Sequence, residues 1–235
     1  MPGSRTYRAI TLDLDDTLWP VGPTLVAAEA TLGEWLREHA PRTGALLSPD
    51  TRAAIRKEVM AAHPQQAHDL GFLRRETLRR AMMLASEDPS LAEVAYAIFL
   101  QARQRVTFFE DVLPVLQRWS TRYRLIAISN GNADLTQVGL SPYFLAAVSA
   151  HEVGFAKPDP RMFHEACRLA DVAPEEVLHL GDDPHLDVIA ARKAGLQAAW
   201  IRRPMLAHRH PADACGPDAP FEDLHAIDAL LKHPD

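Results

Sequence analysis

One short stretch, residues 8–19, constrains the fold of this chain more than any other. It reads RAITLDLDDTLW, an apolar run that ends in three carboxylates within four positions. Short apolar runs bounded by turn residues are typical of a strand that is covered on both faces of a sheet. Asp13, Asp15 and Asp16 would then crowd negative charge at the carboxyl end of a core strand. Because such charges repel one another, the stretch predicts a bound cation or a neutralising Lys.

The next segment, residues 21–105, has a different character. It is rich in Ala, Leu and Arg, and its apolar side chains lie three or four positions apart, the spacing of amphipathic helices. The turn residues Pro20, Gly22 and Pro23 indicate where the first strand unit ends. No strand pattern interrupts the segment, which therefore predicts an inserted all-helical domain. Its helices are expected from residue 25 to Pro41, from Ser48–Asp50 onward, at 72–83 and at 91–103.

From residue 106 to the end, strand and helix patterns alternate. Strands are expected at 124–131, 146–150, 176–183 and 197–201, and helices at 113–121, 160–169, 186–194 and 221–231. This alternation indicates a parallel α/β sheet, with five strands once the opening stretch is included. We therefore expect a Rossmann-like core domain of residues 1–20 and 106–235 and a helical domain of residues 21–105. Sheets of this class bind ligands beyond the carboxyl ends of their strands.

Composition excludes several classes of protein. A formal charge of −6 gives no basic face for nucleic acid. Cys167 and Cys215 are far apart and match no zinc or redox spacing, so we expect buried or incidental thiols in a reducing compartment. No signal peptide or membrane-length apolar run is present, which favours a cytoplasmic protein without membrane contact. We further expect a monomer or a homodimer. Residues 208–220 predict a surface loop, with His208 and His210 as surface residues.

Polar clusters follow three of the predicted strands and one turn. In chain order they are Asp13-Leu14-Asp15-Asp16-Thr17, Ser129-Asn130-Gly131, Lys157-Pro158, and Gly181-Asp182-Asp183 with Asp187. In this order the set resembles the four motifs of the haloacid dehalogenase-like (HAD) superfamily. The resemblance covers the whole α/β portion, and the helical segment lies where that family places its C1-type cap domain.

The resemblance implies a phosphatase that works through an aspartyl-phosphate. Asp13 would be the nucleophile, because a carboxylate can take the phosphoryl group and divide one difficult step into two. Asp15 would be the general acid and then the general base, which requires a carboxyl able to hold a proton near neutral pH. The alternative for both residues is metal ligation with no covalent step. Asp16 is expected to be a solvated or capping carboxylate.

The same resemblance implies a magnesium site. Asp13, the backbone carbonyl of Asp15 and Asp182 would be its ligands, and Asp187 would be the second acid of the last motif, supporting the metal. An all-oxygen donor set suits magnesium. Asp183 competes with Asp187 for that role, and its alternative is a turn former or helix N-cap.

Four residues are expected to bind the phosphoryl group. Ser129 would donate its hydroxyl, and the backbone amide of Asn130 would contribute in a turn that opens towards a helix. Lys157 would offset negative charge around Asp13 and the phosphate. Thr17 would hydrogen-bond near the phosphoryl site. The alternatives are a helix cap for the Ser-Asn pair, a solvated Lys157 and a turn-stabilising Thr17.

The substrate implied is a small phosphorylated metabolite: FMN, 5-amino-6-(5-phosphoribitylamino)uracil, a nucleotide or a sugar phosphate. A phosphomutase or a dehalogenase is the alternative, although dehalogenases of this superfamily lack an acid at the position of Asp15. A signalling module that carries a phospho-Asp is a further alternative, which the cap and Asp15 disfavour. Four other residues have two interpretations: Arg74 and Arg75 could contact a substrate anion or form helical ion pairs around Glu76, and Trp19 and Phe72 could stack on a substrate ring or serve packing. His185 could lie at the edge of the pocket, and His179 is expected to be a hydrogen-bonded core residue.

Overall fold

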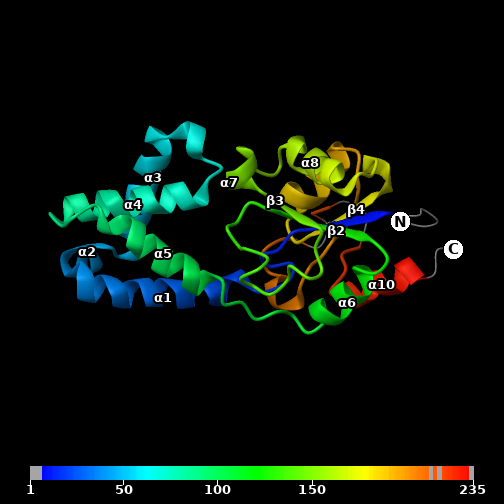
Figure 1. The fold of residues 1–235 in the computed structure, drawn as a ribbon, viewed down its shortest axis with the longest axis horizontal. Helices are drawn as coiled ribbons and strands as arrows, with labels where there is room; N and C mark the ends of the chain where they lie inside the picture. Colours follow the sequence, from blue (N-terminus) through cyan, green and yellow to red (C-terminus); the bar gives the residue numbers. More distant parts are fainter. Residues whose placement is uncertain (1–6, 212–213, 216–218, 233–235) are drawn as a thin grey trace. The chain divides into compact units, whose positions relative to one another are not determined.

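The chain divides into two compact units. The computed structural model of the protein describes residues 7–211, 214–215 and 219–232 (Figure 1). One unit, the core unit, comprises residues 1–20 and 107–235, and the other, the helical unit, comprises residues 21–106.

The core unit contains one parallel sheet of five strands in the order β3-β2-β1-β4-β5, which confirms the predicted α/β fold class. The central strand pairs with both β2 and β4, and its residue Leu12 lies opposite Ala127 and Leu180. The carboxyl ends of these three strands therefore meet at one edge, where ligands of such sheets bind. The strands are β1 (Ala9–Leu12), β2 (Arg124–Ser129), β3 (Ala146–Ser149), β4 (Val177–Gly181) and β5 (Gln197–Trp200).

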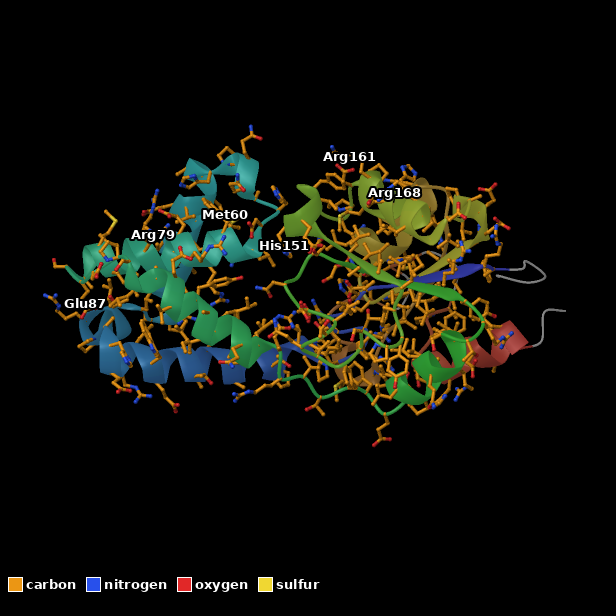
Figure 2. The ribbon with its side chains drawn as sticks, in the orientation of Figure 1. Met60, Arg79, Glu87, His151, Arg161 and Arg168 are labelled. Atoms are coloured by element: carbon orange, nitrogen blue, oxygen red, sulfur yellow. The ribbon has the colours of Figure 1, made fainter. Side chains whose placement is uncertain are left out.

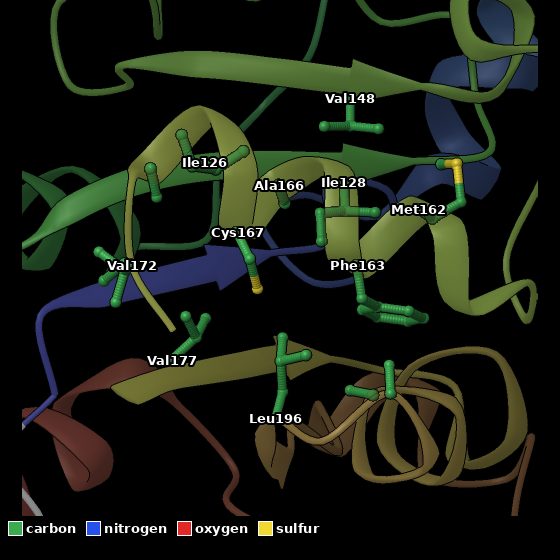
Figure 3. Close-up of a cluster of buried hydrophobic side chains, with 14 of the residues drawn as sticks. Ile126, Ile128, Val148, Met162, Phe163, Ala166, Cys167, Val172, Val177 and Leu196 are labelled. Carbon is green, nitrogen blue, oxygen red and sulfur yellow. The ribbon is translucent and has the colours of Figure 1, made fainter. Parts of the chain in front are cut away.

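Helix α8, residues Pro160–Ala170, shows how the helices of the core unit cover the sheet. The carboxylate of Asp159 caps its first turn by accepting a hydrogen bond from the backbone N–H of Arg161. Arg161 and Arg168 project from its outer face, where they are exposed (Figure 2). The inner face packs on β2, β3 and β4 (Figure 3), and the cluster includes Ile126, Ile128, Val148, Met162, Phe163, Ala166, Cys167, Val177 and Leu196.

The other helical segments of the core unit differ from expectation at three places. Residues 184–189 form a π-helix that begins at Pro184, two residues earlier than predicted. No helix follows β2, because residues 131–145 form bends and turns. The last helix begins three residues later than predicted, since the backbone of Phe221 hydrogen-bonds to Trp200. The remaining helices are α6 (Val112–Trp119), α7 (Ala150–Val153), α9 (Ala190–Lys193) and α10 (Leu224–Lys232), with short 3-10 turns at Pro174–Glu176 and Pro204–Leu206.

The helical unit is built around one apolar core. Ser48 caps α3 by accepting a hydrogen bond from the N–H of Thr51, as its sequence predicts. Helix α1 begins at Val21, so the predicted turn residues Gly22 and Pro23 lie in its first turn. Proline is accepted there because the first N–H groups of a helix have no partner within it. No helix in the described part of the chain is long and apolar enough to cross a membrane. The elements are α1 (Val21–His39), α2 (Pro41–Leu46), α3 (Pro49–Ala62), a 3-10 turn (Pro64–Gln66), α4 (Leu70–Leu84) and α5 (Leu91–Arg103).

Arginines of α4 take part in ion pairs within the helical unit. Arg74 donates to Glu29 at 2.7 Å, and Arg75 lies 3.8 Å from Glu93. The prediction of helical ion pairs is right in kind but wrong in partner, because Glu76 pairs with neither. Burial lowers the pKa of Arg74, although Glu29 opposes that effect.

The two cysteines, Phe72 and two histidines outside the sheet were also given expected environments by the sequence. Cys167 and Cys215 are buried, as expected, and neither is part of a disulfide. Phe72 packs against the core of the helical unit, which supports the packing interpretation. In the predicted loop at 208–220, residues 212–213 and 216–218 lie outside the described residues. His208 is exposed as expected, whereas His210 is half-buried.

Candidate active site

Three carboxylates converge at the carboxyl edge of the sheet. Oxygen atoms of Asp13, Asp182 and Asp187 lie within 4.8 Å of one another. Asp13 follows β1, and its N–H continues the ladder by donating to Leu180 of the neighbouring β4 at 2.8 Å. Asp187 returns to the same place because the π-helix turns its side chain back over Gly181. A Cβ at Gly181 would lie 2.2 Å from the Asp187 carboxyl carbon, so only glycine permits this approach.

Lys157 joins two of these carboxylates. Its side chain is only 2% exposed, and its Nζ donates to Asp13 Oδ1 at 2.5 Å and to Asp187 Oδ1 at 2.6 Å. Asn130 fixes the lysine backbone by two reciprocal bonds, accepting from the N–H of Lys157 at 2.8 Å and donating to its carbonyl at 2.9 Å. The predicted counter-charge is therefore in contact with the predicted nucleophile. The sequence predicts a role for the backbone amide of Asn130, whereas the structure shows that its side chain also takes part, by holding the Lys157 backbone.

The charge of Lys157 does not fully offset the negative charge of the three converging carboxylates, and the pKa values of Asp13 and Asp182 show this. Burial raises the pKa of Asp13 to about 7, with Lys157 opposing and Asp187 adding to the rise. Burial and the charges of Asp13 and Asp187 raise the pKa of Asp182 to about 9. Burial would lower the pKa of Lys157, but its two carboxylate partners outweigh that effect and raise it. Lys157 therefore stays charged, and a further cation would be needed to keep both Asp13 and Asp182 ionised.

The donor set fits magnesium. It consists of carboxylate oxygens at the mouth of a buried strand, and hard oxygen donors suit this ion. Asp13 and Asp182 have the raised pKa values that a cation would relieve. Asp187 is already engaged: Oδ1 accepts from Lys157, and Oδ2 accepts from the backbone N–H of Asp183 at 3.0 Å. Because the pKa is raised at Asp13 and Asp182, where a cation would relieve the repulsion, these two carboxylates are the better candidates for direct contact with the ion.

The ring of His179, a residue of β4, contacts the Asp187 carboxylate. It is fully buried, with Nδ1 2.8 Å from the hydroxyl oxygen of Thr11 and Nε2 3.2 Å from Asp187 Oδ1. This confirms the expectation of a hydrogen-bonded core residue. Burial lowers the pKa of His179, although Asp187 opposes that shift. Asp183, the other candidate for the second acid of the last motif, caps the π-helix by accepting hydrogen bonds from the N–H groups of His185 and Leu186.

The loop after Asp13 directs its other polar groups to different partners. Thr17 is fully buried, and its hydroxyl oxygen lies 3.3 Å from Asp13 Oδ2 and 3.5 Å from Asp182 Oδ1. Asp15 accepts a hydrogen bond from the indole N–H of Trp19 at 2.9 Å. Because Trp19 is fully buried and stacks edge-on against Phe108, it serves packing and holds the Asp15 carboxylate.

Asp16 differs from expectation. It is buried rather than solvated, has a left-handed backbone with φ of 62°, and pairs with Arg209 at 2.5 Å. Arg209 also lies 3.2 Å from Asp182 Oδ2. An Arg in this place was not predicted. The available signal was the cluster of arginines after the last strand, at the same carboxyl edge as the acids.

Ser129 ends β2 at the same edge of the sheet. It is buried, and its hydroxyl oxygen accepts a hydrogen bond from the N–H of Gly131 at 2.9 Å. The expected helix after Asn130 is absent, so neither residue caps one and no helix terminus supplies an anion site there. The hydroxyl hydrogen of Ser129 is not used in the bond to Gly131 and can be donated elsewhere.

Comparison with known proteins agrees with this arrangement. A family model described as haloacid dehalogenase-like hydrolase matches residues 7–195. The chain is 32% identical to the 5-amino-6-(5-phospho-D-ribitylamino)uracil phosphatase YigB of Escherichia coli over 83% of each chain. It is 32% identical to a phosphoserine phosphatase of Thermus thermophilus, over 67% of this chain and 64% of that relative.

Among solved structures, a 2-haloacid dehalogenase from Pseudomonas syringae is similar, with a TM-score of 0.89 and 35% identity over 97% of this chain and 99% of that one. The curated relatives that resemble this chain include phosphoric monoester hydrolases that act on small phosphorylated metabolites, which agrees with the predicted class of enzyme. With its five-stranded parallel sheet and the match of the family model to most of its length, this chain belongs to the haloacid dehalogenase-like hydrolase family.

Proposed function

We propose that this protein is a magnesium-dependent phosphatase that hydrolyses a small phosphate monoester through an aspartyl-phosphate on Asp13. The observation that carries the proposal is the setting of Asp13. One of its carboxylate oxygens accepts from Lys157, and the other lies 3.3 Å from the hydroxyl of Thr17. A buried carboxylate held by two donors beside a second acid, Asp15, is suited to nucleophilic attack with proton transfer.

In the first half-reaction, Asp13 attacks phosphorus and the bond between phosphorus and the ester oxygen breaks. Asp15 gives its proton to that oxygen, which leaves as an alcohol. The hydrogen bond from Trp19 to Asp15 fixes the orientation of the acid. Lys157 and the hydroxyl of Ser129 offset charge on the phosphoryl oxygens.

In the second half-reaction, a water molecule attacks the phosphorus of the aspartyl-phosphate. Asp15, now a carboxylate, takes a proton from that water. The bond between phosphorus and the Asp13 oxygen breaks, which releases phosphate and restores the Asp13 carboxylate. Because the attack is at phosphorus, Asp13 keeps both of its own oxygen atoms.

Asp13, Asp182 and the backbone carbonyl of Asp15 would hold magnesium, and Asp187 would support the site through Lys157. When bound, the ion supplies positive charge that offsets the phosphoryl oxygens and the converging carboxylates. The raised pKa values of Asp13 and Asp182 support this assignment.

The first substrate to test is 5-amino-6-(5-phospho-D-ribitylamino)uracil, because the E. coli relative named for that activity aligns over 83% of this chain. FMN, nucleoside monophosphates and sugar phosphates complete the panel. We expect phosphate release that requires magnesium and disappears in Asp13→Asn. Asp171→Asn is a matched control, since that carboxylate is 94% exposed and lies in a left-handed helix cap that asparagine tolerates. A purified, folded protein without phosphatase activity on any ester would refute the proposal.

A dehalogenase is the second candidate, favoured by the structural similarity to the 2-haloacid dehalogenase from P. syringae. The two reactions differ in where water attacks. During a single turnover in oxygen-18 water, a phosphatase places the label in phosphate. Cleavage of an alkyl ester of Asp13 at its acyl carbon would instead place it in the Asp13 carboxylate. We expect labelled phosphate and no halide release from 2-chloropropionate. Phosphoryl transfer back to substrate without phosphate release would indicate a mutase.

A further inference from the structure

Besides Arg209, a second arginine, Arg203, lies beside the loop of residues 13–19 that follows β1, and it is buried there. It follows β5 and is only 4% exposed. Its Nε and Nη2 both donate to the backbone carbonyl of Thr17, at 3.1 and 2.8 Å. Its Nη1 donates to Asp111 at 2.8 Å, and its guanidinium carbon lies 4.2 Å from the centre of the Phe109 ring.

The partners of Arg203 are themselves fixed. The Asp111 oxygen that accepts from Arg203 also accepts from the backbone N–H of Leu224, at 2.6 Å, at the start of α10. The ring of Phe109 covers the guanidinium, and the N–H of Phe109 donates to the carbonyl of Leu18 at 3.0 Å. Arg203 is thus anchored to the segment of residues 109–111 and, through Asp111, to the start of α10, both outside the loop that it contacts. This anchoring allows it to set the position of the Thr17 peptide.

The Thr17 peptide is connected to the reacting group by a short path. Thr17 presents its carbonyl to Arg203 and its hydroxyl to Asp13, with an oxygen-to-oxygen distance of 3.3 Å. Two backbone bonds close the loop, from Asp16 to Trp19 and from Leu18 to Leu14, each of 2.8 Å. Because the loop is this tight, displacement of the Thr17 peptide would also displace its hydroxyl from the nucleophile.

Stability alone does not account well for a guanidinium at this place. A buried ion pair gives little net stability, because the desolvation of both charges offsets their attraction. A guanidinium can instead give two parallel donors to one oxygen in a rigid plane, which a lysine ammonium cannot reproduce. The forked contact fixes direction as well as distance. This favours an orienting role for Arg203.

We propose that Arg203 is a positioning residue for the nucleophile: its fork on the Thr17 carbonyl holds the Thr17 hydroxyl against Asp13. The proposal rests on the proposed function, in which Asp13 attacks phosphorus. Arg203 itself touches neither the substrate nor the reacting atoms. It therefore affects the rate of the chemical step and leaves substrate affinity nearly unchanged.

The test compares Arg203→Lys with Arg118→Lys. Arg118 is a matched control because it also forks onto one oxygen, Oδ2 of the buried Asp228, at 3.0 and 2.7 Å, but contacts no residue of the site. With p-nitrophenyl phosphate, we expect kcat of Arg203→Lys to fall on the order of 10–100-fold at nearly constant KM, because small misplacements of reacting groups have effects of this size. Arg118→Lys should keep the kcat of the parent. An equal kcat loss in both variants, or none in Arg203→Lys, would overturn the proposal.

A spectroscopic readout separates this inference from the phosphatase assignment. The methyl NMR signal of Thr17 should shift or broaden in Arg203→Lys and stay unchanged in Arg118→Lys, in protein without substrate. If the parent hydrolyses no phosphate ester, the proposed function fails, and an unperturbed Thr17 signal would separately refute the positioning role. An Arg203→Lys variant that does not fold would also count against the proposal, because it would assign the residue a structural role.

Discussion

Replacing Gly181 with alanine provides a sharp test of how the site is assembled. Gly181 is the last residue of β4 and lies directly under the Asp187 side chain. A Cβ at this position would lie 2.2 Å from Asp187 Cγ, 2.4 Å from Oδ2 and 2.5 Å from Cβ. Nonbonded carbon atoms approach to about 3.5–4.0 Å, so the overlap exceeds about 1 Å. Either the strand end or the Asp187 side chain must move.

Asp187 cannot move without losing contacts. It accepts from Lys157 at 2.6 Å and from the N–H of Asp183 at 3.0 Å, and it lies 3.2 Å from His179. Overpacking costs about 1–3 kcal/mol, and breaking a buried ion pair costs about 3–5 kcal/mol. Depending on whether the strand end or the Asp187 side chain moves, we therefore expect the free energy of unfolding to fall by about 1–5 kcal/mol. Turnover should fall on the order of 100-fold, because Lys157 would no longer be held correctly.

The assay is urea unfolding followed by tryptophan fluorescence, together with phosphatase turnover below the unfolding transition. Gly33→Ala is the control. Gly33 lies inside α1, and a Cβ there would meet no heavy atom within 4 Å. That substitution should increase stability by about 0.5–1 kcal/mol, because alanine is the better helix former. A Gly181→Ala variant with the stability and turnover of the parent would refute the packing argument.

Three further substitutions or measurements test other parts of the structure. Lys157→Met should lower the free energy of unfolding by about 3–5 kcal/mol in calorimetry, because Asp13 and Asp187 lose their buried cation; an unchanged melting temperature would contradict this. Ser48→Ala should lower it by about 1 kcal/mol through loss of the α3 cap, and urea unfolding without a shift would argue against that cap. Burial raises the pKa of Cys167 to about 11. Its alkylation in native protein should therefore be slow at pH 8 and rise about tenfold per pH unit towards pH 10, as thiolate forms, whereas rapid labelling at pH 8, followed by mass spectrometry, would disagree.

Much of the fold could be predicted from local pattern. The apolar run at Ala9–Leu12 and the alternation after residue 106 were sufficient for the sheet, because hydrophobic periodicity reports which faces are buried. The errors arose where tertiary contacts decide. Gly22 and Pro23 suggested a turn but lie in the first turn of α1, where proline is tolerated. The bends that follow Asn130 carry no local signal that separates them from a helix start.

The candidate site was predictable as a set of residues but not as a network. The order of the motifs predicts Asp13, Lys157 and Asp182 as site residues. Parallel strands bring the polar groups that follow them to the carboxyl edge of the sheet. Arg203 and Arg209 were not predicted, since they contact Thr17 and Asp16, which lie more than 180 residues earlier in the sequence. Whether such an arginine is buried against a carbonyl or solvated depends on packing that no local pattern records.

Chemical trapping shows whether Asp13 becomes phosphorylated during turnover. An enzyme sample mixed with p-nitrophenyl phosphate and magnesium is quenched in acid and reduced with borohydride, which converts an aspartyl-phosphate to homoserine. Mass spectrometry of the digest then locates the modified residue. We expect homoserine at residue 13 alone, and none in protein without substrate. Phosphate release with no modification at residue 13, or with modification at another aspartate, would contradict it.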